Sequence, residues 1–541
     1  TITDNVTFAQ AKVIEDALNS RDISYNISDT AALIKAGISA DIAVINSAGT
    51  VEANTNANKA EANAMGGATK AISYNILDTG SNVASIDTNA LNEAINIEIS
   101  GTALVSEAVI VDNASNSGTD TYSITDSATN LASSSNALLT KAVNVIANTQ
   151  ATGSEATIIG GYAKAITFSV TDTASNIAGA NTDALSEAFD ITVNNTATVA
   201  QAEFIDARTN GGTNTYSITD SAANLAASSN AVLTEASSVQ ANTNATKSQA
   251  DTIAEFAKAV TYNINDTALN ISGGTTGGRN EAINIVCTTA ATVAEATTID
   301  GASNTSNGGT NTYNIEDTAA AIAASSSEFL AKAGTVTVNN TANKTQANTI
   351  GGFDKAVIYN ISDTAENIAA ANNVARNEAV NISSTTAATV DEATTIDGSN
   401  NTNNGGTNTY NISDSATNIA ASSSVFLAKA GTVTVTGTAD KAQSNTIGEF
   451  AKAVTYNISD TATNIASTNS SALNEAVTIS ASSAATVAEA KTIDDATNSG
   501  SNTYNINDTA LNIFEGDSVA IIAAGTVTAS TNASVAQANR I

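Results

Sequence analysis

The sequence predicts an α/β solenoid, in which the chain winds into successive coils and each coil carries a short parallel β-strand plus a short helix or turn. Three observations support this prediction. The motif seen at Tyr456–Ala466 (YNISDTATNIA) recurs along the whole chain, its spacing is nearly constant, and each repeat divides into two similar halves. A fixed period of this length is typical of a repeat array, and it favours one elongated body over several globular domains.

An aromatic residue opens each of eleven copies of the motif. Successive copies are about 48 residues apart. The approach to the motif alternates between sequences such as GEFAKAVT, which ends just before Tyr456, and a Gly/Asn turn such as Asn307–Thr312. Two slightly different repeats therefore alternate, and residues 1–541 are predicted to form a single continuous solenoid. The opening residues are Tyr25, Tyr74, Tyr122, Phe168, Tyr216, Tyr262, Tyr313, Tyr359, Tyr410, Tyr456 and Tyr504.

Alternation of apolar and polar side chains predicts a strand at the start of each repeat. In Val454–Ser459 (VTYNIS), valine, tyrosine and isoleucine would face the core, while threonine, asparagine and serine would face outward. The aromatic residues are therefore expected to form a ladder in the core. The second half of the repeat, Val477–Ala490, has the same order of alternating run, polar turn and Ala-rich segment. One coil therefore takes about 24 residues.

The Ala-rich segment that follows each strand is expected to be a short helix. Ser459 or Asp460 would be its N-cap, because a side-chain oxygen there accepts free backbone N–H groups and the helix dipole favours a negative charge. A strand–helix–strand–helix order requires parallel strands joined by right-handed crossovers. About 22–23 coils would then form one long parallel sheet along one side of a rod.

An aspartate follows every strand of the motif. We predict that these residues form a structural turn and cap ladder, each cap contributing about 1 kcal/mol. The alternative is a row of calcium ligands, but calcium needs six to eight converging oxygens, and the glycine-rich nonapeptide of calcium-binding β-rolls is absent. No cofactor is therefore expected, with calcium kept as the alternative. The aspartates are Asp29, Asp78, Asp126, Asp172, Asp220, Asp266, Asp317, Asp363, Asp414, Asp460 and Asp508.

An asparagine stands four residues after the aspartate in nine copies, and its amide is expected to bond backbone groups of the adjacent coil. Leu33 and Ala321 replace it in the other two copies. The nine are Asn82, Asn130, Asn176, Asn224, Asn270, Asn367, Asn418, Asn464 and Asn512.

Composition excludes several classes of function. A net charge of −32 and a pI near 4.1 argue against nucleic acid, whose phosphates need Lys and Arg. Histidine is absent, which removes the commonest general base and transition-metal ligand. No apolar run is long enough to span a membrane. The chain contains no P-loop or GxSxG motif, and its carboxylates repeat evenly instead of pairing, so no enzyme is expected. Cys287 is expected to be a small core residue.

The surface and the two ends suggest assembly. Thr1–Ala17 is half a repeat, and Gly525–Ile541 stops where another strand is due; an isolated solenoid needs capping repeats, so more solenoid, other domains or the next subunit should cover both ends. The outward Thr/Asn/Ser face is almost uncharged and suits lateral packing, although strands favour Thr in any case. Self-association is therefore expected end to end, with lateral packing through the Thr/Asn/Ser face as a second possible contact. Glycans could attach to turn asparagines such as Asn194, Asn244 and Asn304.

The SDTAxNIA pattern at Ser362–Ala369 and Ser459–Ala466 resembles repeats of very large secreted bacterial surface proteins. These are adhesin-like and matrix proteins, including cyanobacterial ones, whose repeats combine a strand with a DTAANI-type segment. The resemblance spans essentially the whole chain and implies an extracellular or cell-surface location and a non-enzymatic, structural role. The chain lacks the Asp/Gly-rich loops of calcium-binding adhesins. We therefore expect a surface protein that assembles into a filament, sheath or surface layer; the alternatives are the stalk of a giant adhesin and a viral fibre or virion surface component.

Overall fold

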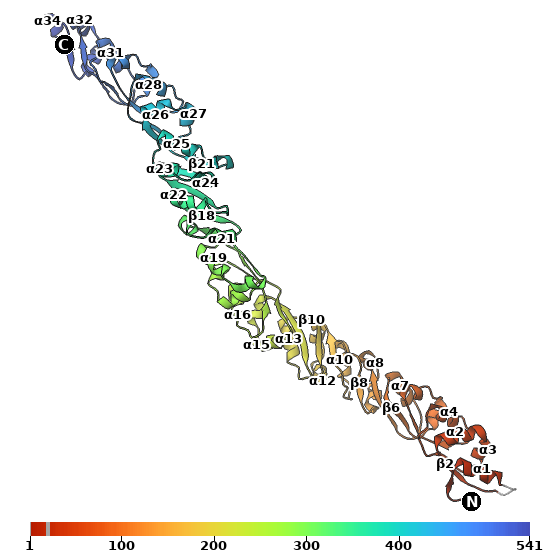
Figure 1. The fold of residues 1–541 in the computed structure, drawn as a ribbon. Helices are drawn as coiled ribbons and strands as arrows, with labels where there is room; N and C mark the ends of the chain where they lie inside the picture. The colour runs from red at the N-terminus through yellow and green to blue at the C-terminus, as the bar shows by residue number, and fades with distance from the viewer. Residues whose placement is uncertain (1, 18–21) are drawn as a thin grey trace. The chain divides into compact units, whose positions relative to one another are not determined.

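Short parallel strands alternate with short helices throughout the structure, a computed structural model that describes residues 2–17 and 22–541. Contacts divide the chain into two compact units: unit 1 comprises Thr1–Ile264 and Thr275–Ile283, and unit 2 comprises Asn265–Gly274 and Asn284–Ile541. Both units are built from the same coils, so the predicted α/β solenoid architecture is confirmed (Figure 1). The single continuous solenoid over residues 1–541 stays a prediction.

The strands are short and follow one another in chain order. They are β1 (Asn5–Val6), β2 (Asn26–Asp29), β3 (Val51–Ala53), β4 (Ile72–Ser73), β5 (Ile76–Asp78), β6 (Ile97–Ala103), β7 (Asp120–Asp126), β8 (Val145–Ala147), β9 (Val170–Asp172), β10 (Ile191–Ala197), β11 (Asn214–Asp220), β12 (Val239–Ala241), β13 (Val260–Thr261), β14 (Ile264–Asp266), β15 (Asn284–Cys287), β16 (Thr310–Thr312), β17 (Ile315–Asp317), β18 (Val336–Ala342), β19 (Ile358–Asp363), β20 (Asn381–Ser384), β21 (Thr407–Thr409), β22 (Ile412–Ser415), β23 (Val433–Ala439), β24 (Val454–Asp460), β25 (Ile479–Ala481), β26 (Asn502–Thr503), β27 (Ile506–Asp508) and β28 (Val527–Ala529).

The helices are equally short. They are α1 (Phe8–Asp16), α2 (Ala31–Ala40), α3 (Ile42–Ser47), α4 (Lys59–Gly66), α5 (Gly80–Val83), α6 (Thr88–Glu93), α7 (Val105–Asp112), α8 (Ala128–Ala132), α9 (Asn136–Lys141), α10 (Gly153–Ile159), α11 (Ala174–Ala178), α12 (Thr182–Glu187), α13 (Val199–Asp206), α14 (Ala222–Ala227), α15 (Asn230–Glu235), α16 (Lys247–Ile253), α17 (Ala268–Ser272), α18 (Thr276–Glu281), α19 (Val293–Asp300), α20 (Ala319–Ala323), α21 (Ser327–Ala331), α22 (Lys344–Ile350), α23 (Ala365–Ala369), α24 (Asn373–Glu378), α25 (Val390–Asp397), α26 (Ala416–Ala421), α27 (Ser424–Leu427), α28 (Lys441–Ile447), α29 (Ala462–Ala466), α30 (Ser470–Glu475), α31 (Val487–Asp494), α32 (Ala510–Glu515), α33 (Ser518–Ala523) and α34 (Val535–Ala538), with 3₁₀ turns η1 (Ser303–Asn307) and η2 (Asn400–Asn404).

Each repeat contains two kinds of coil. The first kind carries a strand and two helices, as in β24, α29 and α30, and the second carries a strand and one helix, as in β25 and α31. The sequence predicts only one helix or turn per coil, so α30 and its equivalents are an addition. The segment Ser470–Glu475 (SSALNE) forms a helix because Ala472 and Leu473 are both buried in the core.

Consecutive strands pair in parallel, and their register varies around the predicted coil length. Paired positions are 21 residues apart at Asn457 and Thr478, and 26 apart at Asn381 and Thr407, where the η2 turn lengthens the coil. Strands β6, β10, β18 and β23 contain register shifts against the strand that follows. In β23 the shift includes Gly437, whose positive φ of 84° suits glycine.

The one long sheet predicted from the sequence is divided into shorter sheets of two to five strands. The ladder breaks where the backbone leaves strand geometry beside the lead tyrosine. Around Tyr74, for example, the strand splits into β4, which pairs with β3, and β5, which pairs with β6. A single parallel bridge between Ala57 and Ile76 spans that break. The sheets therefore follow one another in chain order, with weak points at a regular interval.

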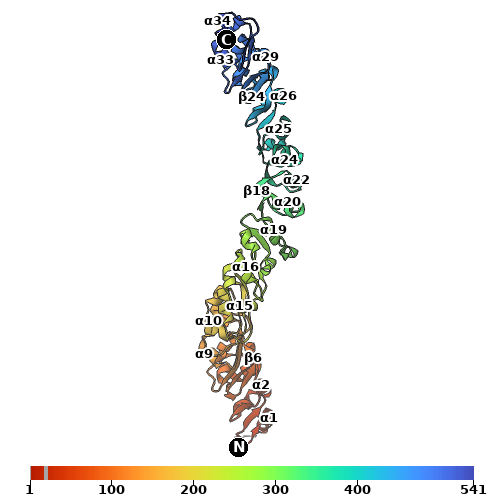
Figure 2. The ribbon, with the colours of Figure 1, turned by 90° about the vertical axis from the view of Figure 1, so that its left-hand side faces the viewer.

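The core lies between the strands and helices of each coil. In β24 the side chains of Val454, Tyr456 and Ile458 are buried, while Thr455 is exposed and Asn457 is half-buried, so the predicted strand faces are confirmed. Burying each large aliphatic side chain contributes about 1.5–3 kcal/mol. Seen from the side in Figure 2, consecutive coils of each unit again follow in chain order. Neighbours in space are thus neighbours in sequence.

Candidate functional site: a cap ladder between coils

The N-cap of the helix after each motif strand is one residue later than the sequence predicts. In α29 it is Thr461, whose Oγ1 accepts the backbone N–H of Asn464 at 3.3 Å, and not Ser459 or Asp460. A hydroxyl at this position satisfies a backbone donor that the first helical turn leaves free. The preceding aspartate is therefore available for other partners.

Asp460 caps a helix, but the helix belongs to the preceding coil. Its Oδ2 accepts the N–H of Lys441, the first residue of α28, at 3.0 Å. Its Oδ1 accepts the N–H of Thr461 at 2.7 Å and the side-chain amide of Asn464 at 2.8 Å. The carboxylate thus joins two consecutive coils. The same bond to the first helical N–H of the preceding coil is made by Asp29, Asp78, Asp126, Asp172, Asp220, Asp317, Asp363, Asp414, Asp460 and Asp508.

Asp266 is the remaining member of the predicted ladder, and it makes the same two bonds within its own coil as Asp460 does. Its Oδ1 accepts the N–H of Thr267 at 2.7 Å and the amide of Asn270 at 2.8 Å. All eleven aspartates therefore occupy equivalent positions at the end of a motif strand.

The asparagine four residues after the aspartate has a different partner from the one predicted. In all nine copies its amide donates to the aspartate of its own coil, and not to backbone groups of the adjacent coil. The aspartate ends the strand just before the N-cap, and the asparagine stands in the first helical turn, so its amide reaches back to the carboxylate. The asparagine thus bonds Oδ1 of the same carboxylate that caps the neighbouring coil through Oδ2.

In nine of the eleven copies, the helix that follows the motif strand also receives a cap from the next coil. The N–H of Ala462, the first residue of α29, donates to Oγ of Ser483 at 3.0 Å. Sequence reasoning missed this second set, because the capping residue lies about 21 residues away and is recognised only once the strand register is known. Its members are Thr55, Thr149, Asn195, Thr243, Thr289, Asn340, Thr386, Ser483 and Thr531.

Hydrogen bonding lowers the pKa of seven of the ladder aspartates and so keeps them ionised. Burial raises the pKa of Asp460, but bonds from the N–H of Lys441, the amide of Asn464 and the N–H of Thr461 outweigh burial and hold the pKa below its usual value. The same balance lowers the pKa of Asp78, Asp172, Asp220, Asp363, Asp414 and Asp508. Because both carboxylate oxygens already accept N–H groups, a calcium ion would have to displace them. Within residues 2–17 and 22–541, no three acidic or cysteine side chains converge on a metal position.

The eleven lead aromatic residues are all buried. In eight of the ten tyrosines the hydroxyl has a partner across the core, whereas the hydroxyls of Tyr313 and Tyr410 have none. Tyr456 donates to the carbonyl of Ala472 in α30 at 2.7 Å, which ties the strand to the second helix of its coil. Burial raises the pKa of Tyr122 to about 12, as expected for a phenol that loses hydration when ionised. Equivalent bonds join Tyr74, Tyr122, Tyr216, Tyr262, Tyr359 and Tyr504 to backbone carbonyls sixteen residues later.

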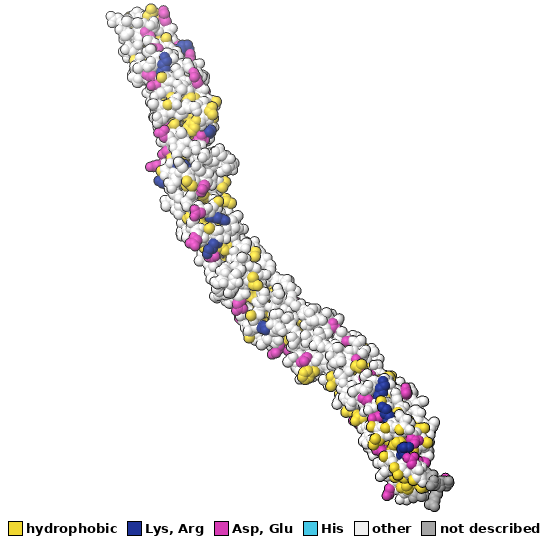
Figure 3. Space-filling model, turned by 45° about the vertical axis from the view of Figure 1, so that its right-hand side comes forward, with side chains coloured by type: hydrophobic (Ala, Val, Ile, Leu, Met, Phe, Trp, Pro, Cys, Tyr) yellow, Lys and Arg dark blue, Asp and Glu magenta, His cyan; other side chains and the backbone are white. Residues whose placement is uncertain are grey.

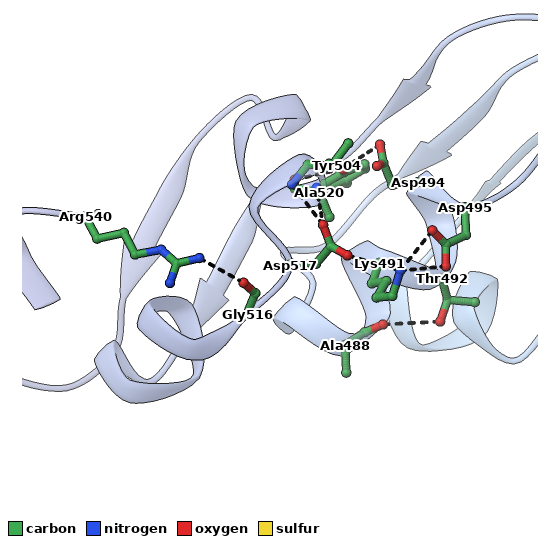
Figure 4. A network of polar contacts seen from close by, with 11 residues as sticks. Ala488, Lys491, Thr492, Asp494, Asp495, Tyr504, Gly516, Asp517, Ala520 and Arg540 are labelled. Carbon is green, nitrogen blue, oxygen red and sulfur yellow. Dashed lines mark hydrogen bonds and ion pairs between the residues drawn. The ribbon is translucent and has the colours of Figure 1, made fainter.

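Ion pairs add further links between consecutive coils. Lys332 pairs with Asp300, and Lys429 with Asp397, each at 2.7 Å. Near the end of unit 2, Lys491 lies between Asp495 at 3.0 Å and Asp517 of the next coil at 3.1 Å (Figure 4). These side chains are 22–61% exposed, so water screens each pair and its contribution to stability is small.

Shallow grooves recur on the helical side where helices of consecutive coils meet. One of about 380 Å³ lies between α13 and α14, and another of about 530 Å³ lies between α10 and α11. A third of about 470 Å³ lies between α25 and α26. The carboxylates in the first two grooves are Glu203 and the ladder residues Asp220 and Asp172.

Much of the view in Figure 3 is white, which marks backbone and uncharged polar side chains, with acidic and basic side chains scattered between them. Two sequence predictions need correction here. Asn304 is only 1% exposed, so it is too buried to accept a glycan, whereas Asn194 and Asn244 are exposed. Cys287 is half-buried at the end of β15 and is not a core residue; burial raises the pKa of its thiol to about 11.

Comparison with known proteins gives this chain no family. No protein-family model matches it, and no curated protein is significantly similar to it. Within the described residues, no helix is long and apolar enough to cross a membrane. The resemblance to the DTAANI-type surface repeats therefore stays a prediction, and function has to be argued from the cap ladder and the surface.

Proposed function

We propose that this chain is a non-enzymatic structural protein of the cell surface or extracellular space, and that it assembles into a filament, sheath or surface layer. The cap ladder is the observation that supports this best. In most helices that directly follow a strand, the first N–H bonds a side chain of the next coil, so neighbouring coils stabilise one another by side-chain bonds as well as by strand pairing. Such a chain resists separation of its coils, which is what a structural element under tension needs.

The strength of this connection can be estimated per coil. One cap contributes about 1 kcal/mol, and the backbone bonds of a parallel strand pair add about 1 kcal/mol each. Stability in a repeat array is the sum of coil terms and nearest-neighbour terms. Caps that cross most boundaries between coils raise the nearest-neighbour term, so the array is expected to unfold in larger cooperative segments. No metal is required for this stability.

The stalk of a giant adhesin is the second candidate, and the net charge favours it. A charge of −32 keeps copies of the chain apart in solution, which suits a stalk that presents a binding domain and does not assemble. A filament or layer instead needs a surface on which this repulsion is overcome.

Electron microscopy of the purified chain over a range of concentrations separates the two candidates. Regular fibres or sheets that grow with protein concentration are the expected result. Sodium chloride is the control variable, because screening of like charges should lower the concentration needed for assembly. Particles that stay single at every protein and salt concentration would refute assembly and support the stalk.

A further inference from the structure

An exposed apolar patch lies in unit 1 where the strands of consecutive coils begin. Phe189 and Val143 are each 54% exposed, and Ile146, on the outward face of β8, is 41% exposed. Phe189 directly follows the buried Ala188, and its N–H donates to the carbonyl of Phe168 in the preceding coil. That bond fixes the backbone so that the ring stands outside the core. A large aromatic side chain held in solvent this way marks a contact surface.

A hollow lies directly beside the Phe189 ring. It has a volume of about 200 Å³ and forms where the ladder between β8 and β9 is reduced to isolated bridges. Ala147, Thr149, Gln150 and Thr167 line it together with Phe189. All the residues that line it are uncharged, in a chain with 52 acidic side chains. The patch therefore presents a protruding ring and a neutral cavity side by side.

Two unpaired charges of opposite sign border the patch. The amino group of Lys164 donates to the carbonyl of Val143 at 2.8 Å, which holds the cation against the apolar side chains. Glu187 is exposed and stands two residues before Phe189. In the part of the chain that the structure describes, neither residue forms an ion pair. Each charge can therefore take a partner from another molecule.

The same lysine, glutamate and apolar residue recur at equivalent positions in both units, so the arrangement belongs to the repeat. Burial raises the pKa of two of these glutamates, Glu281 and Glu378. The further sets are Lys70, Glu93 and Ile95; Lys258, Glu281 and Ile283; Lys355, Glu378 and Val380; and Lys452, Glu475 and Val477.

We infer that the Phe189 surface, formed by Val143, Ile146, Lys164, Glu187 and Phe189, docks a second copy of this chain about a two-fold axis. Phe189 of each copy enters the hollow of the other, and Lys164 of each faces Glu187 of the other. This inference rests on the proposed self-assembly and names the surface that carries it.

Three features favour a second copy as the occupant. A two-fold contact uses the same patch on both copies, so that patch must carry both a protrusion and a cavity. The Phe189 ring and the hollow beside it meet this requirement. The bordering charges complement themselves after a two-fold rotation, which favours one register. Finally, no charged residue lines the hollow, so the ring of a second copy that enters it meets no carboxylate there. A repeated lysine, glutamate and apolar set would extend the contact from one repeat to the next.

The test is sedimentation velocity of the full chain between about 1 and 100 µM, a range that covers modest protein affinities. The wild type should pass from monomer to dimer. Phe189→Asp should weaken the dimer at least 100-fold, because it places a carboxylate in each apolar contact. Val425→Asp is the matched control: Val425 in α27 is also exposed, so this change should leave the dimer intact. Unchanged circular dichroism shows that both variants fold.

A charge exchange tests the pairing itself. Lys164→Glu should weaken the dimer at least 10-fold, because two glutamates then face each other at each of two positions. The double variant Lys164→Glu with Glu187→Lys should recover wild-type affinity, since the exchanged charges again complement each other across the axis. A structural role for either residue within its own coil would not give this recovery.

Each remaining outcome overturns a different statement. Assemblies that form equally well with Phe189→Asp would refute the Phe189 surface while leaving the proposed function intact. A wild-type dimer without larger assemblies would support the surface and refute the filament or layer. A monomeric wild type that is retained on cellulose or chitin, with retention lost in Phe189→Ala, would assign the hollow to carbohydrate and refute the docking of a second copy.

Discussion

The cap made by Asp363 offers a direct test of how the coils are joined. Its Oδ2 accepts the N–H of Lys344, in the helix α22 of the preceding coil, at 2.9 Å. Its Oδ1 accepts the N–H of Thr364 at 2.8 Å and the amide of Asn367 at 2.9 Å. Asp363→Asn keeps one acceptor oxygen and turns the other into a donor, so the bond to Lys344 or the turn of its own coil is lost. A lost cap costs about 1–2 kcal/mol.

Amide hydrogen exchange measured by mass spectrometry gives the readout. A loss of about 1–2 kcal/mol should accelerate exchange across Lys344–Ile350 about 5–30-fold. The equivalent helix Lys441–Ile447 is capped by Asp460, so it provides a control within the same molecule and should not change. Asn367→Leu, which copies the leucine found naturally at Leu33, should also leave α22 unchanged because it removes only a bond to Oδ1.

One pattern of hydrogen exchange would contradict the assignment of this cap. Asp363→Ala removes both acceptor oxygens; if exchange in this variant accelerates only in α23, the helix of the aspartate's own coil, then Asp363 does not cap the preceding coil. The pH dependence gives a second check. Burial raises the pKa of Asp363, but hydrogen bonds outweigh burial and hold the pKa below its usual value. The contribution of Asp363 is therefore present above that usual value and is lost as pH falls through the lower, folded-state pKa. The difference between wild type and Asp363→Asn should therefore disappear in acid.

Three further predictions replace a residue by the one found at the same place in other repeats, and each is measured as a shift in the urea midpoint. Ser444→Ala should stabilise by about 1 kcal/mol, because the buried hydroxyl has no hydrogen-bond partner; an unchanged midpoint would contradict this. Arg376→Leu should raise the free energy of unfolding by about 1–3 kcal/mol, because Arg376 is 6% exposed and its buried guanidinium bonds carbonyls such as that of Ala369. Arg376→Ala should instead lower the free energy of unfolding. Asp120→Asn should stabilise the protein at pH 7, because the equivalent Asn214 shows that an amide at this position can donate to a helix carbonyl. Burial raises the pKa of Asp120, so the gain in stability should shrink as pH falls through that raised pKa. A gain that stays constant with pH would refute this prediction.

The sequence was sufficient for the coil and its core. Alternation in Val454–Ser459 places Tyr456 and Ile458 inside, and burial agrees, because strand faces depend only on a period of two. The even spacing of the motif likewise predicts parallel strands in chain order. These features follow from local patterns that repeat eleven times.

The cap ladder could not be predicted in the same way, because its partners are set by register between coils. Nothing near Asp460 in sequence indicates that its second oxygen reaches Lys441, nineteen residues earlier. The hydroxyl of Ser483 is equally remote from Ala462. The Phe189 surface has a similar origin, since the hollow forms only where β8 and β9 lose regular pairing.

The direction of the caps has a consequence for biosynthesis. A helix in one coil is completed by an oxygen that the ribosome adds about twenty residues later, as Lys441 and Asp460 illustrate. Since translation proceeds from the N-terminus and domains fold as they emerge, the newest coil on a growing chain lacks its final bond until its successor appears. Each unit is therefore completed from its N-terminus toward its C-terminus. The coil that has just left the ribosome is the one whose helix still lacks its cap from the next coil.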